Sequence, residues 1–450
     1  MPKVLRILLA VALLALAQDA GAKKKKPQSD SVGDLAATVD EFSRAMADQM
    51  EGLALGLAQD PQSLAQAGDI FEKVVEMRHP LGDVAAELAT LDRLADARVG
   101  AAQALCQAGE FQPAVDQATK GLAQAAARDA LLAGGRLAAA DRAAAEVEAR
   151  WDEGQAQLVL GHAHAGLREF DPARTAYARA LELFWRPQWR GPKAEALEGA
   201  GLVALAAGHA AEAIRSYEYR LFLVRELGDR HGEIGTLDDL ARAQLAGGRG
   251  AEAVGSLAAA IRLVRELRES GQAAPEGSSY DATELKLLLR QVDTLGGLAG
   301  WEDARTYGAA ALTLAQATGD AASELTARLR LAQAAANLVL WDEAAEQYGA
   351  SMERVLAHRD AEAASALRNA GVVFIAKGEL DVARQAFDLA VEIAREIGSR
   401  VQEQDALDSV GLTELRREQP AAAVEPLERA VALARELSDV RAETASLERL

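Results

Sequence analysis

A short phrase recurs four times along the chain. It reads Val-Arg-Glu-Leu or a close variant, and its copies start at Val224, Val264, Ala394 and Ala434. In three of the four copies a pair such as Gly-Asp or Ser-Asp follows. The first two copies stand 40 residues apart, and so do the last two. Self-similarity at this period is typical of stacked supersecondary units, each of which buries the apolar face of its neighbour. The chain is therefore expected to form an array and not a single globular core.

The distances between the copies also predict one insertion. Weaker copies start at Ala315 and Val355, so the step after Val264 is 51 residues long while the later steps are 40 and 39. The extra residues must fall within 268–283, where Gly, Ser and Pro gather. These residues favour loops, because Gly admits left-handed backbone angles and Pro removes a helix donor. The segment is either a long loop or a flexible joint that divides the array.

Composition and periodicity favour helices throughout. Hydrophobic residues make up 50% of the chain and aromatics 4%, with 11 prolines, a balance typical of closely packed helices rich in Ala and Leu. Between copies of the phrase, apolar residues recur every three or four positions, which is the helical spacing. In one example Leu367 and Gly371 share a face and Gly378 ends the helix. A second helix then buries Ala383 and Phe387, so each repeat is predicted to be a helical hairpin.

This arrangement of small and large residues resembles the tetratricopeptide repeat, in a lengthened variety of about 40 residues. The same spacing returns in other copies, which include Leu160, Gly161, Ala173, Tyr177 and Ala180; Leu197, Gly201, Ala213 and Tyr217, with Arg220 in the place of the last small residue; and Leu407, Gly411, Ala423, Leu427 and Ala430. The resemblance implies an all-α fold, a right-handed α-solenoid of stacked helix–turn–helix repeats, over about residues 97–450. A terminal capping helix is expected over residues 440–450. Gly134, Gly135 and Ala139 predict a further, compact and degenerate repeat.

The N-terminus has the features of an export signal. Lys3 and Arg6 precede an apolar run over residues 7–17, and small residues at 20–22 offer cleavage after Ala22. The run is too short to span a bilayer, which takes about 20 residues. Four lysines at 23–26 follow directly and oppose translocation. The chain is expected to be periplasmic or secreted. In the alternative, the apolar segment stays as an N-terminal membrane anchor.

These features divide the chain into six segments. They are a signal peptide (1–22), a basic disordered linker (23–35), an N-terminal helical segment (36–95), the first part of the array (96–267), the flexible insertion (268–283), and the second part of the array with its capping helix (284–450). No membrane span is expected in the mature chain.

Several classes of function are disfavoured. A formal net charge of −19 argues against nucleic-acid binding, which needs clustered Lys and Arg. The single Cys106 permits no intramolecular disulfide and is interpreted as a small core residue. His162 and His164 are two residues apart, so they point to different faces of a helix and cannot share a metal ion. The run Gly247-Gly248-Arg249-Gly250 is interpreted as a turn between helices and not a phosphate loop. No catalytic residue, metal or cofactor is therefore expected.

The candidate binding residues lie on the first helices of the later repeats. The resemblance implies that these helices line a concave groove. Their outward polar residues would form a partly basic strip beside Asp293, made of Arg290, Arg330, Gln333, Asn337, Arg368 and Asn369. Arg and Asn side chains suit the carboxylates and backbone amides of an extended peptide. The same residues also fit an ordinary solvated face.

The tryptophans form a second group of interest. Trp185, Arg186 and Trp189 either grip a ligand by stacking or stiffen a corner and pack on the neighbouring repeat. Trp301 and Trp341 each stand at a turn and are interpreted as packing residues.

The sequence therefore predicts a non-enzymatic scaffold that binds a protein or peptide segment in its groove, within a bacterial envelope complex. The alternative is a cytoplasmic, membrane-tethered regulator. An enzyme with a dispersed site is the least favoured interpretation, since no nucleophile–base pair is present.

Overall fold

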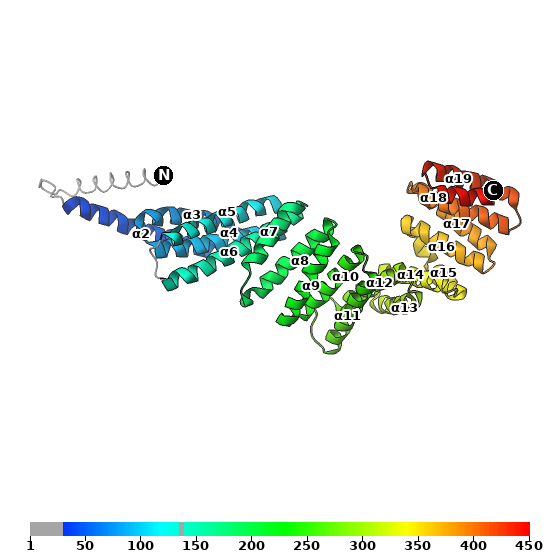
Figure 1. Cartoon of the computed structure of the whole chain (residues 1–450), viewed down its shortest axis with the longest axis horizontal. Helices are drawn as coiled ribbons and strands as arrows, with labels where there is room; N and C mark the ends of the chain where they lie inside the picture. Colours follow the sequence, from blue (N-terminus) through cyan, green and yellow to red (C-terminus); the bar gives the residue numbers. More distant parts are fainter. Residues whose placement is uncertain (1–29, 135–138) are drawn as a thin grey trace. The chain divides into compact units, whose positions relative to one another are not determined.

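The computed structural model describes residues 30–134 and 139–450, and over these ranges the chain forms α-helices, short 3-10 turns and no strands. The all-α prediction is confirmed. The helices, labelled as in Figure 1, are α2 (Asp30–Leu57), α3 (Leu64–Arg78), α4 (Val84–Gln107), α5 (Phe111–Ala133), α6 (Ala139–Gly166), α7 (Phe170–Leu183), α8 (Arg190–Ala206), α9 (Ala210–Leu227), α10 (Arg230–Ala246), α11 (Gly250–Glu269), α12 (Tyr280–Gly297), α13 (Trp301–Thr318), α14 (Ala321–Asn337), α15 (Trp341–His358), α16 (Ala361–Ala376), α17 (Leu380–Glu396), α18 (Arg400–Arg416), α19 (Pro420–Glu436) and α20 (Val440–Arg449). The proposed signal peptide, residues 1–22, and the lysines at 23–26 lie outside the described residues.

The helices pair into hairpins in chain order (Figure 1). We call the even-numbered helices α2 to α18 the A helices and the odd-numbered helices α3 to α19 the B helices. An A helix packs on the B helix that follows it, as in α4–α5, α8–α9 and α16–α17, and successive A helices such as α12, α14, α16 and α18 also touch. The chain comprises two compact units, an N-unit that ends at Asp239 and a C-unit that begins at Leu240.

The residues after the recurring phrase form the turn between one hairpin and the next. Gly228 (φ 69°) ends α9 and Gly319 (φ 70°) ends α13, both in the left-handed region that Gly adopts without steric cost. The Asp that follows caps the next A helix, as Asp320 does when its Oδ1 accepts a hydrogen bond from the Ser323 amide at 3.1 Å. Arg359 stands in the Gly place after α15 and takes the same left-handed conformation (φ 44°). The period of about 40 residues is thus the length of one hairpin and its turn.

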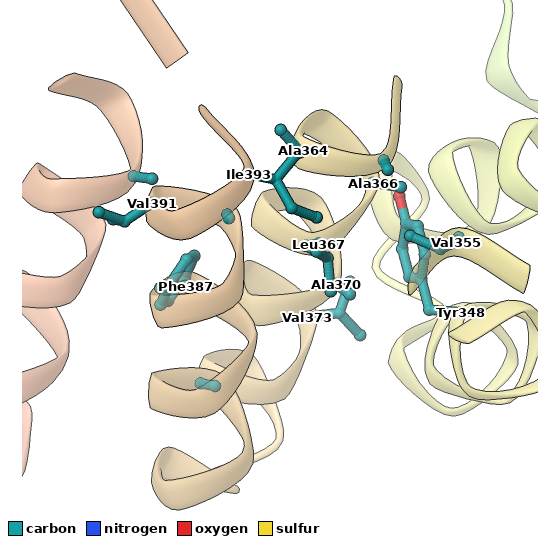
Figure 2. Close-up of a cluster of buried hydrophobic side chains, with 14 of the residues drawn as sticks. Tyr348, Val355, Ala364, Ala366, Leu367, Ala370, Val373, Phe387, Val391 and Ile393 are labelled. Carbon is teal, nitrogen blue, oxygen red and sulfur yellow. The ribbon is translucent and has the colours of Figure 1, made fainter. Parts of the chain in front are cut away.

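Inside a hairpin, small residues let the two helices approach, as predicted. A Cβ placed on Gly371 of α16 would lie 2.6 Å from the ring of Phe387 on α17, so only Gly fits there. Ala383 and Phe387 are both fully buried. Phe387 belongs to a buried cluster that includes Leu367 of α16 and Tyr348 of α15 (Figure 2). The register predicted for this hairpin is therefore confirmed.

Arg220 stands where the repeat pattern has a small residue, and an ion pair compensates for its buried charge. The residue lies on α9 and is 8% exposed. Its Nη2 donates to a carboxylate oxygen of Glu198 on α8 at 2.7 Å, and its Nη1 donates to the Thr236 hydroxyl on α10. A buried charge is tolerated when it is paired and hydrogen-bonded. Here a polar link between three helices replaces the close contact that a small residue would allow.

The N-terminal boundaries need correction. Helix α2 begins at Asp30, so residues 30–35 of the predicted linker 23–35 are helical. Helices α2 and α3 form a hairpin, and α4 begins at Val84, so the boundary predicted between 95 and 96 falls inside a helix. The glycine and alanine pattern of the later repeats is missing from α2 and α3, which is why the sequence does not mark them as a repeat.

The predicted degenerate repeat around Gly134, Gly135 and Ala139 is wrong. Helix α5 continues to Ala133 over 23 residues, and α6 runs for 28 residues from Ala139 to Gly166. The described residues on both sides of 135–138 therefore belong to two long helices of adjacent hairpins. Gly135 itself lies outside the described residues. Both described stretches are rich in Ala, the strongest helix former, which favours two long helices over the short ones of a compact repeat.

The insertion lies where predicted but is shorter than 268–283. Helix α11 continues to Glu269 and α12 begins at Tyr280. The Tyr280 hydroxyl donates to the Ala273 carbonyl at 3.1 Å within the loop. Arg265 of α11 and Glu284 of α12 form a salt bridge of 2.6 Å, so the two helices pack directly across the insertion. The boundary between the N-unit and the C-unit lies in α10 and not here. Flexibility of this loop stays a prediction.

Helix α20 covers the last hairpin, as predicted. Its Ser446 is fully buried and donates to Asp408 Oδ1 of α18 at 2.8 Å. Arg449 forms a salt bridge with the same carboxylate at 2.6 Å. Arrays need such polar end helices because the final repeat has no neighbour to cover it.

Candidate functional site

Three A helices of the C-unit carry predicted binding residues at equivalent positions. A residue with positive φ stands in the turn after each of α12, α14 and α16, namely Ala299, Val339 and Gly378. Nine residues before these turn residues lie Arg290, Arg330 and Asn369, and three positions further along lie Asp293, Gln333 and Val372. Helix α14 packs on both α12 and α16. Arg290, Arg330 and Asn369 therefore form one row across the three helices, and Asp293, Gln333 and Val372 form a second row. We call the surface formed by these six residues the A-helix face.

Arg330 joins all three helices of this face. Its Nε lies 2.5 Å from Asp293 Oδ1 on α12, and its Nη1 lies 3.2 Å from Glu362 Oε1 on α16. The two carboxylates balance the positive charge, so the strip is less basic than predicted. Nothing in the sequence around Glu362 indicates this role, because the contact depends on how α14 and α16 are placed side by side.

A small pocket opens beside Arg330. Its volume is about 290 Å³ and its walls come from α12, α13 and α14, with Val292, Asp293, Gly296, Gly297, Trp301, Ala304, Arg330, Gln333 and Ala334 as lining residues. Trp301 packs against the buried cluster of Val292, as predicted, and also forms part of the pocket wall. This volume lies at the lower end for ligand pockets and suits one amino-acid side chain. An aromatic wall beside an Arg–Asp pair offers both apolar and polar contacts.

The structure separates Asn337 from the other predicted residues. Asn337 is the last residue of α14 and is exposed. Its Nδ2 donates to the Gln333 carbonyl at 2.8 Å. The side chain thus satisfies the end of its own helix and does not extend either row.

Arg368 lies beside Asn369 of the face on α16, and both are partly buried. Arg368 Nη1 donates to Asn369 Oδ1 at 3.2 Å. Asn369 also forms a hydrogen bond with Tyr348, whose pKa burial raises to about 12 while Arg330 and Asn369 oppose the shift. On α18, burial raises the pKa of Asp405, and the nearby Arg368 acts in the opposite direction. These contacts hold both side chains in fixed positions.

In the tryptophan cluster between α7 and α8, one tryptophan fits the packing interpretation and the other fits the ligand-stacking interpretation. Trp189 is 8% exposed and packs on Trp151 of α6, with ring centroids 5.5 Å apart. Trp185 is 54% exposed, and the Arg186 guanidinium lies 5.1 Å from the centroid of its ring. Trp189 is therefore a packing residue, whereas Trp185 presents an open aromatic face.

The remaining residues with possible chemistry stand apart from one another. Over residues 30–134 and 139–450 no group of three or more His, Cys, Asp and Glu is placed to hold a metal ion. Burial lowers the pKa of His162, while His164 Nδ1 pairs with Glu169 at 2.7 Å. Cys106 is half-buried against the Val99 cluster, and burial raises the pKa of its thiol. Among the helices described, none is both long and apolar enough to cross a bilayer.

A family model described as tetratricopeptide repeat matches residues 362–436, which span α16 to α19. The chain is similar to the signal transduction ATPase with a tetratricopeptide repeat sensor from Pyrococcus horikoshii, at 13% identity and a TM-score of 0.51, over 86% of this chain and 55% of that one. It is also similar to the apo form of RapI, at 11% identity and a TM-score of 0.52, over 79% of this chain and 97% of that one. The chain thus spans about half the length of the first of these structures. No curated protein matches the sequence.

Stacked helical hairpins with a repeated turn define a repeat protein of the α-solenoid class, whose typical role is to bind other polypeptides rather than to catalyse a reaction. Residues 362–436 match the tetratricopeptide repeat model, and the stacked hairpins on either side share the fold of tetratricopeptide repeat structures.

Proposed function

We propose that this chain is a non-enzymatic scaffold whose A-helix face binds an extended segment of a partner protein. The observation that carries the proposal is the row of Arg290, Arg330 and Asn369 across three neighbouring helices, beside a pocket with an aromatic wall. An extended segment would place one side chain in the pocket. Its backbone and carboxylate groups would meet the Asn and Arg side chains. Since Arg330 and Asn369 are already held by hydrogen bonds and salt bridges, little ordering of these two side chains accompanies binding.

Reversing one charge on the A-helix face and one directly beside it is expected to weaken partner capture at least tenfold. The variant is Arg330→Glu with Arg368→Glu, which leaves acidic side chains beside Asp293 and Asp405 and repels a carboxylate ligand. Partner recovery is measured by affinity capture with quantitative mass spectrometry, and helicity by circular dichroism. A milder pair, Arg330→Gln with Arg368→Gln, keeps the test valid if the charge reversal perturbs folding.

The matched control changes two arginines on B helices or their turns. Arg305 of α13 and Arg359 after α15 also form salt bridges with neighbouring helices, to Glu343 and Glu392 respectively. Arg305→Glu with Arg359→Glu should therefore disturb stability in a similar way and leave capture intact. A photo-crosslinking residue at Gln333 should also label the partner, while one at the exposed Thr313 of α13 should not. Equal recovery with both double variants would remove the A-helix face from consideration.

The proposed location is the bacterial envelope, after export and cleavage following Ala22. Support comes from the short apolar run and the small residues before the cut. The competing proposal is a cytoplasmic regulator that keeps this segment as a membrane anchor, because the four lysines at 23–26 oppose translocation.

Cell fractionation with N-terminal sequencing is expected to find the chain in the soluble envelope fraction with Lys23 as its first residue. Replacing Ala20 and Ala22 with bulky residues should then retain the uncleaved chain on the membrane. A chain that keeps residues 1–22 and faces the cytoplasm would instead support the anchored regulator.

A further inference from the structure

A larger groove lies in the N-unit, among α2, α3, α4 and α5, and has a volume of about 1310 Å³. It exists because α3 has only 15 residues, while α2 has 28 and α5 has 23. Arg98 of α4 contacts both Asp69 on α3 and Gln117 on α5. Asp69 and Gln117 therefore lie at about the same height along these two B helices. From there α5 continues about two turns beyond the end of α3. The space beside and beyond α3 is therefore left unfilled.

The groove is lined mainly by apolar and adaptable side chains. Three of the five methionines of the chain lie there: Met46 and Met50 on α2, and Met77 on α3. Leu91 of α4 and Leu131 of α5 also line it. Methionine is flexible and polarizable, so it adapts to irregular apolar surfaces and is frequent where proteins bind helices of varied sequence. We call this surface the methionine groove.

An exposed apolar stripe extends the groove along α2. Phe42 and Leu53 are 47% and 59% exposed, although both are large and apolar. They lie on the same face of the helix as Met46 and Met50, because the four residues are spaced at three- and four-residue intervals. A volume above 1000 Å³ that continues into a helical stripe exceeds what most small ligands fill. The geometry suits a helix laid into a groove.

Charge around the groove indicates the kind of helix. Asp48, Asp69 and Glu72 are 71%, 61% and 50% exposed, whereas their cationic partners Arg78 and Arg98 are 8% and 1% exposed. The carboxylates therefore meet solvent and these two arginines do not. The groove lining carries one lysine, Lys73, against the four carboxylates of Asp69, Glu72, Glu76 and Glu87. Helix α2 itself carries six acidic residues and one arginine. A second copy of this chain would bring like charges together, so a helix with Lys and Arg is favoured.

We propose that the methionine groove binds an amphipathic helix of a partner protein, with an apolar face flanked by Lys and Arg. It is a second binding surface, on the N-unit, and does not depend on the role of the A-helix face. The apolar residues of the bound helix would cover Phe42 and Leu53 and enter the groove beside Met46. Its basic residues would lie against Asp48, Asp69 and Glu72.

The test follows the methionine methyl groups of the full chain by NMR after selective ¹³C labelling. The probe is an 18-residue amphipathic helix of Leu, Ala and Lys. One control probe has Glu in place of Lys, and another has the same composition with Leu distributed around the helix. The Lys probe is expected to shift the signals of Met46, Met50 and Met77 in a saturable way. Met352, packed on a buried cluster of the C-unit, should not shift and so serves as the internal control.

Met46→Glu should weaken binding of the Lys probe at least tenfold. The variant adds a negative charge, so non-specific electrostatic attraction to the cationic peptide would become stronger. Binding in the groove, in contrast, would become weaker, so the two kinds of binding are distinguished. Met50→Gln gives a second variant without a charge change, and the signal of Met77 before the probe is added, which both variants retain, reports that the N-unit is folded. Three results would overturn the proposal: no shift of the groove methionines, equal affinity for the Glu probe or the redistributed probe, or shifts that follow protein concentration alone, which would indicate a second copy.

Discussion

Replacing Ala383 with arginine is expected to lower the free energy of unfolding by about 3–5 kcal/mol, which is the cost of leaving a charge buried without a partner. Ala383 is 0% exposed and lies in the cluster of Leu367 and Phe387, where α17 packs on its neighbours. The midpoint of thermal unfolding, followed by circular dichroism, should fall by about 10 °C.

The matched control is Val382→Arg, one position earlier on the same helix. Val382 is 43% exposed, so its new charge stays in water and the free energy should change by about 0.5 kcal/mol or less. Because repeat arrays unfold in segments, limited proteolysis should show that Ala383→Arg exposes α16 to α19 first. Equal melting midpoints for the two variants would show that the helix crossing is not where the structure places it.

The hairpins with small residues at their crossings were predictable because close packing leaves a visible pattern. Gly161, Gly201 and Gly371 each face an aromatic ring on the following B helix, and any Cβ there would lie within 2.8 Å of that ring. Such positions accept very few residue types, so the sequence repeats them. The Gly-Asp turn is equally restricted by its left-handed angle and its helix cap.

The residues that bind across helices were harder to predict. Arg330 was placed on the correct face. Its partner Glu362, however, lies 32 residues away in sequence and on another helix. Asn337 was grouped with Gln333 by helical spacing, yet its position at the helix end turns its amide to a backbone carbonyl. Helical periodicity indicates which face a side chain occupies, whereas its partner is set by the neighbouring element.

The first hairpin, α2 and α3, was not recognised as a repeat because buried arginines hold its helices together where the glycine and alanine pattern is absent. Arg78 of α3 bonds to Glu51 of α2 and Thr90 of α4, and Arg98 of α4 bonds to α3 and α5. Arg128 of α5 forms salt bridges with α4 and α6. In a sequence, a buried arginine looks the same as a surface one. These side chains help to hold α2 to α6 together, and in α2 and α3 they do so without the pattern that marks the later repeats.

Arg128→Met is accordingly expected to destabilise the N-unit by about 3–5 kcal/mol, because it leaves a buried carboxylate without its partner. Arg128 is 1% exposed and pairs with Asp152 of α6 at 2.6 Å and with Asp92 of α4. Asp152 is 6% exposed. Asp152→Asn in the same chain should recover much of the loss, because the amide has no charge to bury. Urea unfolding of the three proteins measures both effects.

The pH dependence distinguishes loss of the ion pair from loss of packing. Burial raises the pKa of Asp152 from 3.8 to about 7, with Arg128 opposing the shift and the charges of Asp96 and Glu148 adding to it. The folded protein therefore holds this proton more tightly than the unfolded chain does, and its stability should decline as pH rises from about 4 to about 7. Without Arg128 the pKa rises further, so in Arg128→Met the decline should be steeper and extend above pH 7. Adding Asp152→Asn should remove this contribution and leave a smaller slope from Asp96, whose pKa burial also raises. If the single and double variants showed parallel pH profiles, the arginine would be acting only by filling space.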